Sequence, residues 1–225
     1  MSTLVLMRHG QASFGEARYD SLSETGRAQA RHTGAWLGER GDMPTAVWTG
    51  PRRRQADTAA LVIAASGIGH SPVLAPLLEE FAEGEEVLAA AAELFGRPMT
   101  GPEAPPRTEQ LRCYDAAYEA WSRNRVAIPG RAAFGVFRGG VRQWLREVVA
   151  VPDAPSGQRI LAVTSSGVIA AVVCDVLGLG DEQWCALVRL IQNGSLTEVV
   201  FSRGRTGLRT FNSAGHLPRE LVSTI

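Results

Sequence analysis

The sequence predicts an α/β fold in which a doubly wound, mostly parallel sheet is flanked by helices. Hydrophobic residues make up 45% of the 225-residue chain, which is enough to form the core of one such domain. Short, mainly apolar runs at residues 4–7, 46–49 and 159–165 are typical of strands buried on both faces of a parallel sheet. A helical pattern follows each of these runs, so strands and helices alternate along the chain.

The first part of the chain is predicted to alternate from its start. Ser23 can cap a helix, and Gly41 is placed to end it after about Arg40. The turn at Gly50-Pro51 separates the next strand from the next helix. In order, the predicted elements are a strand at 4–7, a helix from 24 to about 40, a strand at 46–49, a helix at about 52–65 and a short strand at 72–75.

A helical insertion is predicted at about residues 85–150. Three helical patterns, at about 85–95, 109–123 and 134–150, are separated by a proline-rich stretch and by Pro129-Gly130. No linker divides the chain, so we expect one domain, residues 1–225, whose helical cap covers an edge of the sheet. After the strand at 159–165 we expect a helix from Ser166 to near Gly178, a short helix after Asp181, and an edge hairpin at 195–202 and 207–211 with Gly204 in its turn.

Composition excludes several classes of function. The 23 basic and 23 acidic residues give a net charge of zero, which argues against nucleic acid or an anionic membrane as a partner. Every basic residue is arginine, so chemistry that depends on a lysine is excluded. The three cysteines have neither disulfide nor zinc spacing, and the apolar runs are too short to cross a bilayer. We therefore expect a soluble, cytoplasmic protein.

The segment Arg8-His9-Gly10 stands directly after the first predicted strand. A neutral imidazole can attack phosphorus, and an adjacent arginine can hold phosphoryl oxygens with its planar fork of donors. The segment therefore indicates a phosphate site at the carboxyl edge of the sheet. A purely structural role for the tripeptide is the alternative.

Three consecutive arginines, residues 52–54, stand where the second predicted strand turns into a helix. Arg54 and Thr58 are one helical step apart and share a face. Cations at a helix N-terminus oppose the helix dipole, so an anion is expected nearby, and a bound phosphate would supply it. A solvated helix start and a nucleic-acid contact are the alternatives.

Taken together, these motifs resemble the histidine phosphatase superfamily, the cofactor-dependent phosphoglycerate mutase-like proteins. The resemblance rests on Arg8-His9-Gly10, on Leu22-Ser23-x-x-Gly26-x-x-Gln29-Ala30, on Arg54 before Thr58-Ala59, and on Leu78-x-Glu80-x-x-x-Gly84. It implies a phosphohistidine intermediate on His9, with Arg8 and Arg54 binding the phosphoryl group and Glu80 acting as the acid.

Glu80 needs a raised pKa to act as an acid near neutrality, either by burial or by neighbouring carboxylates such as Glu79 and Glu83. The acidic residues around it, Glu79, Glu83, Glu85 and Glu86, are otherwise interpreted as a solvated face.

The chain departs from the family pattern after the fourth core strand. It has Thr164-Ser165-Ser166-Gly167 where relatives usually have Ser-His-Gly-Gly, so Ser165 stands in place of the second active-site histidine. A serine hydroxyl still donates a hydrogen bond but is never cationic. Gln11 and Ser13 are further candidates for substrate binding, or they satisfy the loop backbone. The other histidines, His32, His70 and His216, are expected to be structural or exposed.

The sequence thus predicts a phosphomonoester hydrolase of reduced activity that works on a small phosphorylated substrate. No metal or organic cofactor is implied. The alternative is a catalytically degenerate phosphate-binding or interaction module on the same fold. The sequence leaves the substrate's identity open, and it leaves open whether the protein forms a homo-oligomer.

Overall fold

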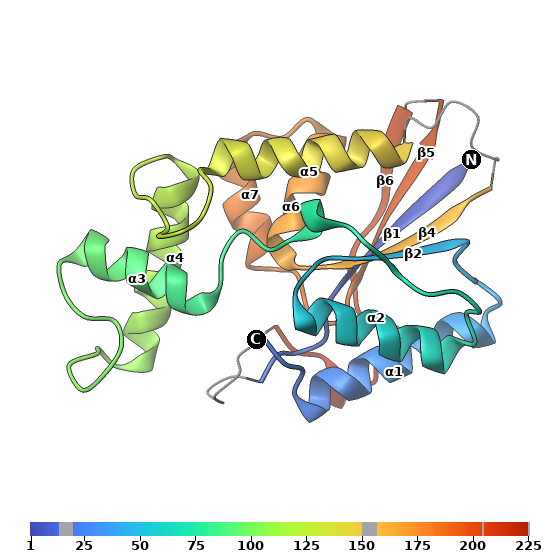
Figure 1. The fold of residues 1–225 in the computed structure, drawn as a ribbon, viewed down its shortest axis with the longest axis horizontal. Helices are drawn as coiled ribbons and strands as arrows, with labels where there is room; N and C mark the ends of the chain where they lie inside the picture. The colour runs from blue at the N-terminus through green and yellow to red at the C-terminus, as the bar shows by residue number, and fades with distance from the viewer. Residues whose placement is uncertain (14–19, 150–156, 204, 225) are drawn as a thin grey trace.

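The strands form one six-stranded sheet in the order β3-β2-β4-β1-β5-β6 (Figure 1). The computed structural model describes residues 1–13, 20–149, 157–203 and 205–224. Four neighbouring strands are parallel: β3 (Val73–Leu74), β2 (Ala46–Thr49), β4 (Arg159–Thr164) and β1 (Ser2–Arg8). Two antiparallel strands complete the sheet next to β1, namely β5 (Leu196–Ser202) and β6 (Arg205–Ser213).

Strand β1 is buried on both of its faces. Leu4 and Leu6 belong to one hydrophobic core, whereas Val5 and Met7 belong to a second core on the other side of the sheet. This division follows from the two-residue period of a strand. Each such side chain contributes roughly 1.5–3 kcal/mol when it is removed from water.

Helices cover both faces of the sheet, as a doubly wound fold requires. Helices α1 (Glu24–Glu39) and α2 (Arg53–Ser66) pack against each other on one side, and α5 (Phe134–Val149) and α6 (Ser166–Leu177) lie together on the other (Figure 1). Ser23 caps α1 by accepting a hydrogen bond from the Gly26 N–H at 3.1 Å, and Gly41, with φ of 66°, follows its end. The predicted fold class is therefore confirmed.

The helices of the predicted insertion divide into two groups. Helices α3 (Gly84–Phe95) and α4 (Arg107–Ser122) pack on each other beyond the sheet, whereas α5 packs on α6 (Figure 1). Rings hold the groups together: Trp121 of α4 meets Phe134 of α5 with 5.2 Å between centroids, and Phe134 also meets Trp184 at 4.9 Å. Trp184 belongs to α7 (Asp181–Val188), the short helix predicted after Asp181.

The C-terminal hairpin differs from its prediction in one respect. Only β6 lies at the edge of the sheet, because β5 pairs with β1 on its other side. The predicted turn residue, Gly204, lies outside the described residues. Two short 3₁₀ helices, Pro76–Leu78 and Arg219–Leu221, complete the described elements. Within the described ranges, no helix combines the length and hydrophobicity needed to span a membrane.

Candidate active site

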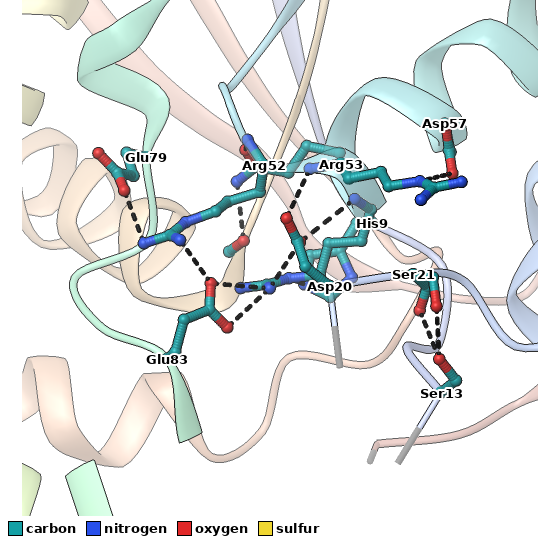
Figure 2. A network of polar contacts seen from close by, with 12 residues as sticks. His9, Ser13, Asp20, Ser21, Arg52, Arg53, Asp57, Glu79 and Glu83 are labelled. Atoms are coloured by element: carbon teal, nitrogen blue, oxygen red, sulfur yellow. Dashed lines mark hydrogen bonds and ion pairs between the residues drawn. The ribbon is translucent and has the colours of Figure 1, made fainter. Parts of the chain in front are cut away.

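The site lies at the edge where the parallel strands end. His9 follows β1, Arg54 stands in the first turn of α2 after β2, and Ser165 follows β4. The backbone N–H of His9 donates to the carbonyl of Thr164 at 2.8 Å, so the ends of β1 and β4 are joined. Figure 2 shows His9 among charged side chains that come from several loops.

The loop after β1 approaches the start of α1 closely. A Cβ at Gly10 would lie 2.3 Å from the carbonyl oxygen of Gly26, so only glycine fits there. The Gly10 N–H donates to Thr58 Oγ1 at 3.1 Å, and that hydroxyl donates to the Arg54 carbonyl at 2.7 Å. These contacts hold His9 against α1 and α2.

The His9 ring is buried and has partners for both of its nitrogens. Nδ1 lies 2.7 Å from the carbonyl oxygen of Gly10, which can only accept, so we assign the proton to Nδ1. Arg54 Nε donates to Nε2 at 3.2 Å. Burial, followed by the charges of Arg54 and Arg8, lowers the pKa of His9 well below its usual 6.5. The result is a neutral imidazole whose Nε2 carries the lone pair.

Arg54 is buried between His9 and two carboxylates. Its Nη1 lies 3.0 Å from Asp20 Oδ1 and 2.9 Å from Glu83 Oε2. Burial acts to lower the pKa of Arg54, but the carboxylates of Glu83, Glu80 and Asp20 outweigh it and raise that pKa. Arg54 is therefore a permanent cation beside the His9 ring.

Asp20 also supplies the anion that the N-terminus of α2 requires. Its carboxylate accepts from the backbone N–H of Arg53 at 2.9 Å and from that of Arg54 at 3.4 Å. The sequence pattern predicted a bound phosphate in this role. The structure assigns the role to a side chain of the chain itself, and a carboxylate there is favoured by the helix dipole.

The Glu80 carboxylate is buried at the start of α6. It accepts from the backbone N–H of Phe81 at 3.0 Å and from that of Gly167 at 3.3 Å. A Cβ at position 167 would lie 2.3 Å from Glu80 Oε1, so glycine makes this approach possible. Burial raises the pKa of Glu80, although the two N–H groups and the charges of Arg54 and Arg8 oppose it. Burial, rather than a carboxylate neighbour, is thus the cause of the shift.

Arg8 joins the end of β1 to the C-terminal segment. Its Nη1 donates to the carbonyl oxygens of Ile191 and Thr224. Its charge contributes to the pKa shifts of both His9 and Glu80. The phosphate-binding role of Arg8 stays a prediction.

Gln11 and Ser13 make contacts within the loop that precedes α1. Gln11 Oε1 lies 2.9 Å from the hydroxyl of Ser23, and Ser13 Oγ lies 2.8 Å from that of Ser21. These bonds fit the alternative in which the two side chains satisfy the loop. Their role in substrate binding stays a prediction.

Ser165 is fully buried and is held by α2. Its Oγ accepts from Gln55 Nε2 at 2.9 Å, and Gln55 Oε1 accepts from the backbone N–H of Arg52 at 3.0 Å. Because the amide donates to the hydroxyl oxygen, the hydroxyl hydrogen of Ser165 stays available for a second acceptor.

Of the acidic residues around Glu80, Glu85 is exposed as expected, but Glu79, Glu83 and Glu86 are ion-paired instead of forming a solvated face. Glu83 is 18% exposed and bonds both Arg52 and Arg54, and Glu79 pairs with Arg52 and Arg131. Sequence reasoning also missed Asp20 and Gln55. In the sequence, only the run of three arginines at residues 52–54 indicated that carboxylates lie nearby.

The remaining histidines lie where they were expected. His216 packs on Trp36, with 5.1 Å between ring centroids, and its Nε2 lies 2.9 Å from Thr33 Oγ1. Burial lowers the pKa of His216 to about 4, which keeps the ring neutral. His32 and His70 are exposed. Within the described ranges, no group of three or more His, Cys, Asp or Glu residues is arranged to hold a metal ion.

A neutral histidine at a strand end, an adjoining arginine and a buried glutamate thus lie together at the carboxyl edge of the sheet. The family model of the histidine phosphatase superfamily (branch 1) matches residues 4–214. The chain therefore belongs to the histidine phosphatase superfamily. No curated protein sequence matches it significantly.

Solved structures of phosphatases share the fold over nearly all of their length. Phosphoserine phosphatase from Entamoeba histolytica, as a mutant in complex with phosphoserine, is 18% identical, with 97% of this chain and 100% of that chain covered and a TM-score of 0.66. A mycobacterial glucosyl-3-phosphoglycerate phosphatase is 23% identical, with 94% and 98% covered and a TM-score of 0.65. The α-ribazole phosphatase of Shigella flexneri is 21% identical, with 94% and 96% covered and a TM-score of 0.65. At these identities the likeness establishes the fold.

Proposed function

We propose that this protein is a phosphomonoester hydrolase that works through a phosphohistidine intermediate on His9. The observation that carries the proposal is the state of the His9 ring. Its Nδ1 proton is held by the Gly10 carbonyl, its Nε2 lone pair meets a buried arginine, and its pKa is lowered. In-line attack requires a neutral imidazole with its proton on Nδ1, and the Arg54 Nε–H must leave Nε2 for a phosphoryl oxygen as the P–N bond forms.

In the first step His9 Nε2 attacks phosphorus and a P–N bond forms as the bond from phosphorus to the leaving oxygen breaks. Arg54 and Arg8 stabilise the negative charge on the phosphoryl oxygens. Glu80 gives its proton to the leaving oxygen, so the alcohol departs neutral and Glu80 is left ionised.

In the second step water attacks the phosphohistidine. Glu80, now a carboxylate, takes a proton from the water as the new P–O bond forms and the P–N bond breaks. Inorganic phosphate leaves, and His9 and Glu80 return to their starting states. A hydrolase is favoured over a mutase because a mutase must shield its intermediate from water, and the sequence shows no device for that.

Ser165 is the reason to expect reduced activity. One missing preorganised donor costs on the order of 10²–10³ in rate, which slows a phosphatase without abolishing its reaction. The alternative function, a degenerate phosphate-binding module, draws its support from the same substitution. The substrate is proposed to be a small phosphomonoester, the chemical class to which the phosphoserine bound by the Entamoeba structure belongs. Cys113, Cys174 and Cys185 are free and buried, which suits a reducing cytoplasm.

Hydrolysis of p-nitrophenyl phosphate tests the proposal. We expect turnover by the unaltered protein, its loss in His9→Ala, and no change in His70→Ala, since His70 is exposed and follows the C-terminal end of α2, whereas Arg54 lies in the first turn. Absence of turnover on this and a wide panel of phosphomonoesters would reject the hydrolase. If no substrate is turned over but the protein binds inorganic phosphate, and Arg54→Ala abolishes that binding, the degenerate phosphate-binding module is favoured.

A further inference from the structure

Two carboxylates from separate loops hold the same nitrogen of Arg54. Asp20, just before α1, meets Nη1 at 3.0 Å, and Glu83, just before α3, meets it with both oxygens at 3.0 and 2.9 Å. Figure 2 shows the two carboxylates approaching from different parts of the chain. Neither residue is needed for the chemical steps described above.

The geometry of a guanidinium gives this arrangement a consequence. The group is planar, and its five N–H donors keep fixed directions relative to one another. Fixing Nη1 between two acceptors therefore fixes the direction of the Nε–H bond as well. In this structure the Nε–H bond points to His9 Nε2 at 3.2 Å.

We propose that Asp20 and Glu83 are positioning residues that orient the Arg54 guanidinium toward the phosphoryl group carried on His9. The inference rests on the proposed function for its chemistry. The orientation itself is a geometric property that can be measured without turnover.

The position of Glu83 is itself firmly fixed. Its Oε1 also meets Arg52 Nη1 at 2.9 Å, and its backbone N–H donates to Glu86 Oε2 at 2.7 Å at the start of α3. Glu86 is in turn bonded to Arg131 Nε at 2.7 Å. These contacts at the start of α3 thus fix the position of the Glu83 carboxylate.

A competing account makes Glu83 an internal anion that substrate phosphate must displace from Arg54. The atoms that make contact argue against it. Glu83 occupies Nη1, whereas the Nε2 lone pair of His9 accepts from Nε. A phosphoryl group on Nε2 therefore replaces the bond from Nε to the ring, and the bonds from Nη1 to the Glu83 carboxylate can stay in place. The two accounts predict opposite effects of removing Glu83.

Glu83→Ala, Glu83→Gln and the matched control Glu79→Ala separate the accounts. Glu79 pairs with Arg52 and Arg131, so its removal takes the same charge from the same network without touching the described contacts of Arg54. For Glu83→Ala we expect kcat to fall by up to about 10²-fold, the cost of a misplaced group, with a smaller change in KM. Glu83→Gln keeps an acceptor for Nη1 and should retain most of the activity, and Glu79→Ala should match the unaltered protein.

The ¹⁵N resonance of His9 Nε2 gives a readout that does not depend on turnover. We expect it to move in Glu83→Ala and in Asp20→Ala, because the bond from Arg54 Nε is lost, and to stay in place in Glu79→Ala. A resonance that stays unchanged in both loop variants, or tighter binding of inorganic phosphate with unchanged kcat in Glu83→Ala, would overturn the proposal. If the unaltered protein shows no turnover, the proposed function fails, and the resonance still decides the positioning.

Discussion

At the scale of single residues, burial acts on a base and on an acid and favours the uncharged form of each. Desolvation disfavours a charged group, so it lowers the pKa of His9 and raises that of Glu80. A neutral imidazole is the form that attacks phosphorus, and a protonated carboxyl is the form that donates to a leaving oxygen. One physical cause therefore prepares both partners of the proposed reaction.

The pH dependence of kcat/KM follows from these two shifts. As pH falls through the lowered pKa of His9, the ring becomes protonated and kcat/KM falls. This acid limb lies below pH 6.5, the usual pKa of histidine. As pH rises through the raised pKa of Glu80, the carboxyl group loses its proton and kcat/KM falls again. This alkaline limb lies above pH 4.5, the usual pKa of glutamate. A profile corrected for substrate ionisation should be bell-shaped, and Glu80→Gln should lack the alkaline limb. Activity that increases steadily with pH would contradict the assignment of Glu80.

At the scale of elements, the start of α2 shows what the sequence could and could not predict. The arginines at this helix N-terminus led to the expectation of a nearby anion, and that expectation was correct. Its source was not predictable, because Asp20 reaches the helix from a loop 34 residues earlier than Arg54. The inner strands β1, β2 and β4 were predicted well, because a run of apolar residues indicates a buried strand whichever strands it pairs with.

Helix α5 offers a test of stability that is independent of the site. Gly139 lies exposed in the helix interior, and a Cβ there would meet no described atom within 4 Å. Gly139→Ala should raise the free energy of unfolding by about 0.5–1 kcal/mol, because alanine loses less backbone entropy in a helix. At the neighbouring Gly140 a Cβ would lie 3.3 Å from Leu77 Cδ2, so Gly140→Ala should gain less. Urea denaturation measures both, and equal destabilisation by both variants would contradict the account.

At the scale of the whole molecule, the topology brings the candidate site together. Parallel strands end at one edge of the sheet, so motifs that follow β1 and β2 had to meet there. That rule placed the loops of His9 and Arg54 near the same edge, and the resemblance to the family implied that the two side chains act together. It could not place Gln55 on Ser165 or Glu83 on Arg54, because such contacts depend on side-chain directions and loop paths that no local pattern records.

The central claim is that His9 carries the phosphoryl group during turnover. The direct measurement is to mix the protein with ³²P-labelled aryl phosphate, quench in alkali, in which phosphohistidine survives, and identify the labelled peptide. The account predicts label on His9 in the unaltered protein and none in His9→Ala. Turnover that continues without label on His9, or label on another residue, would contradict it.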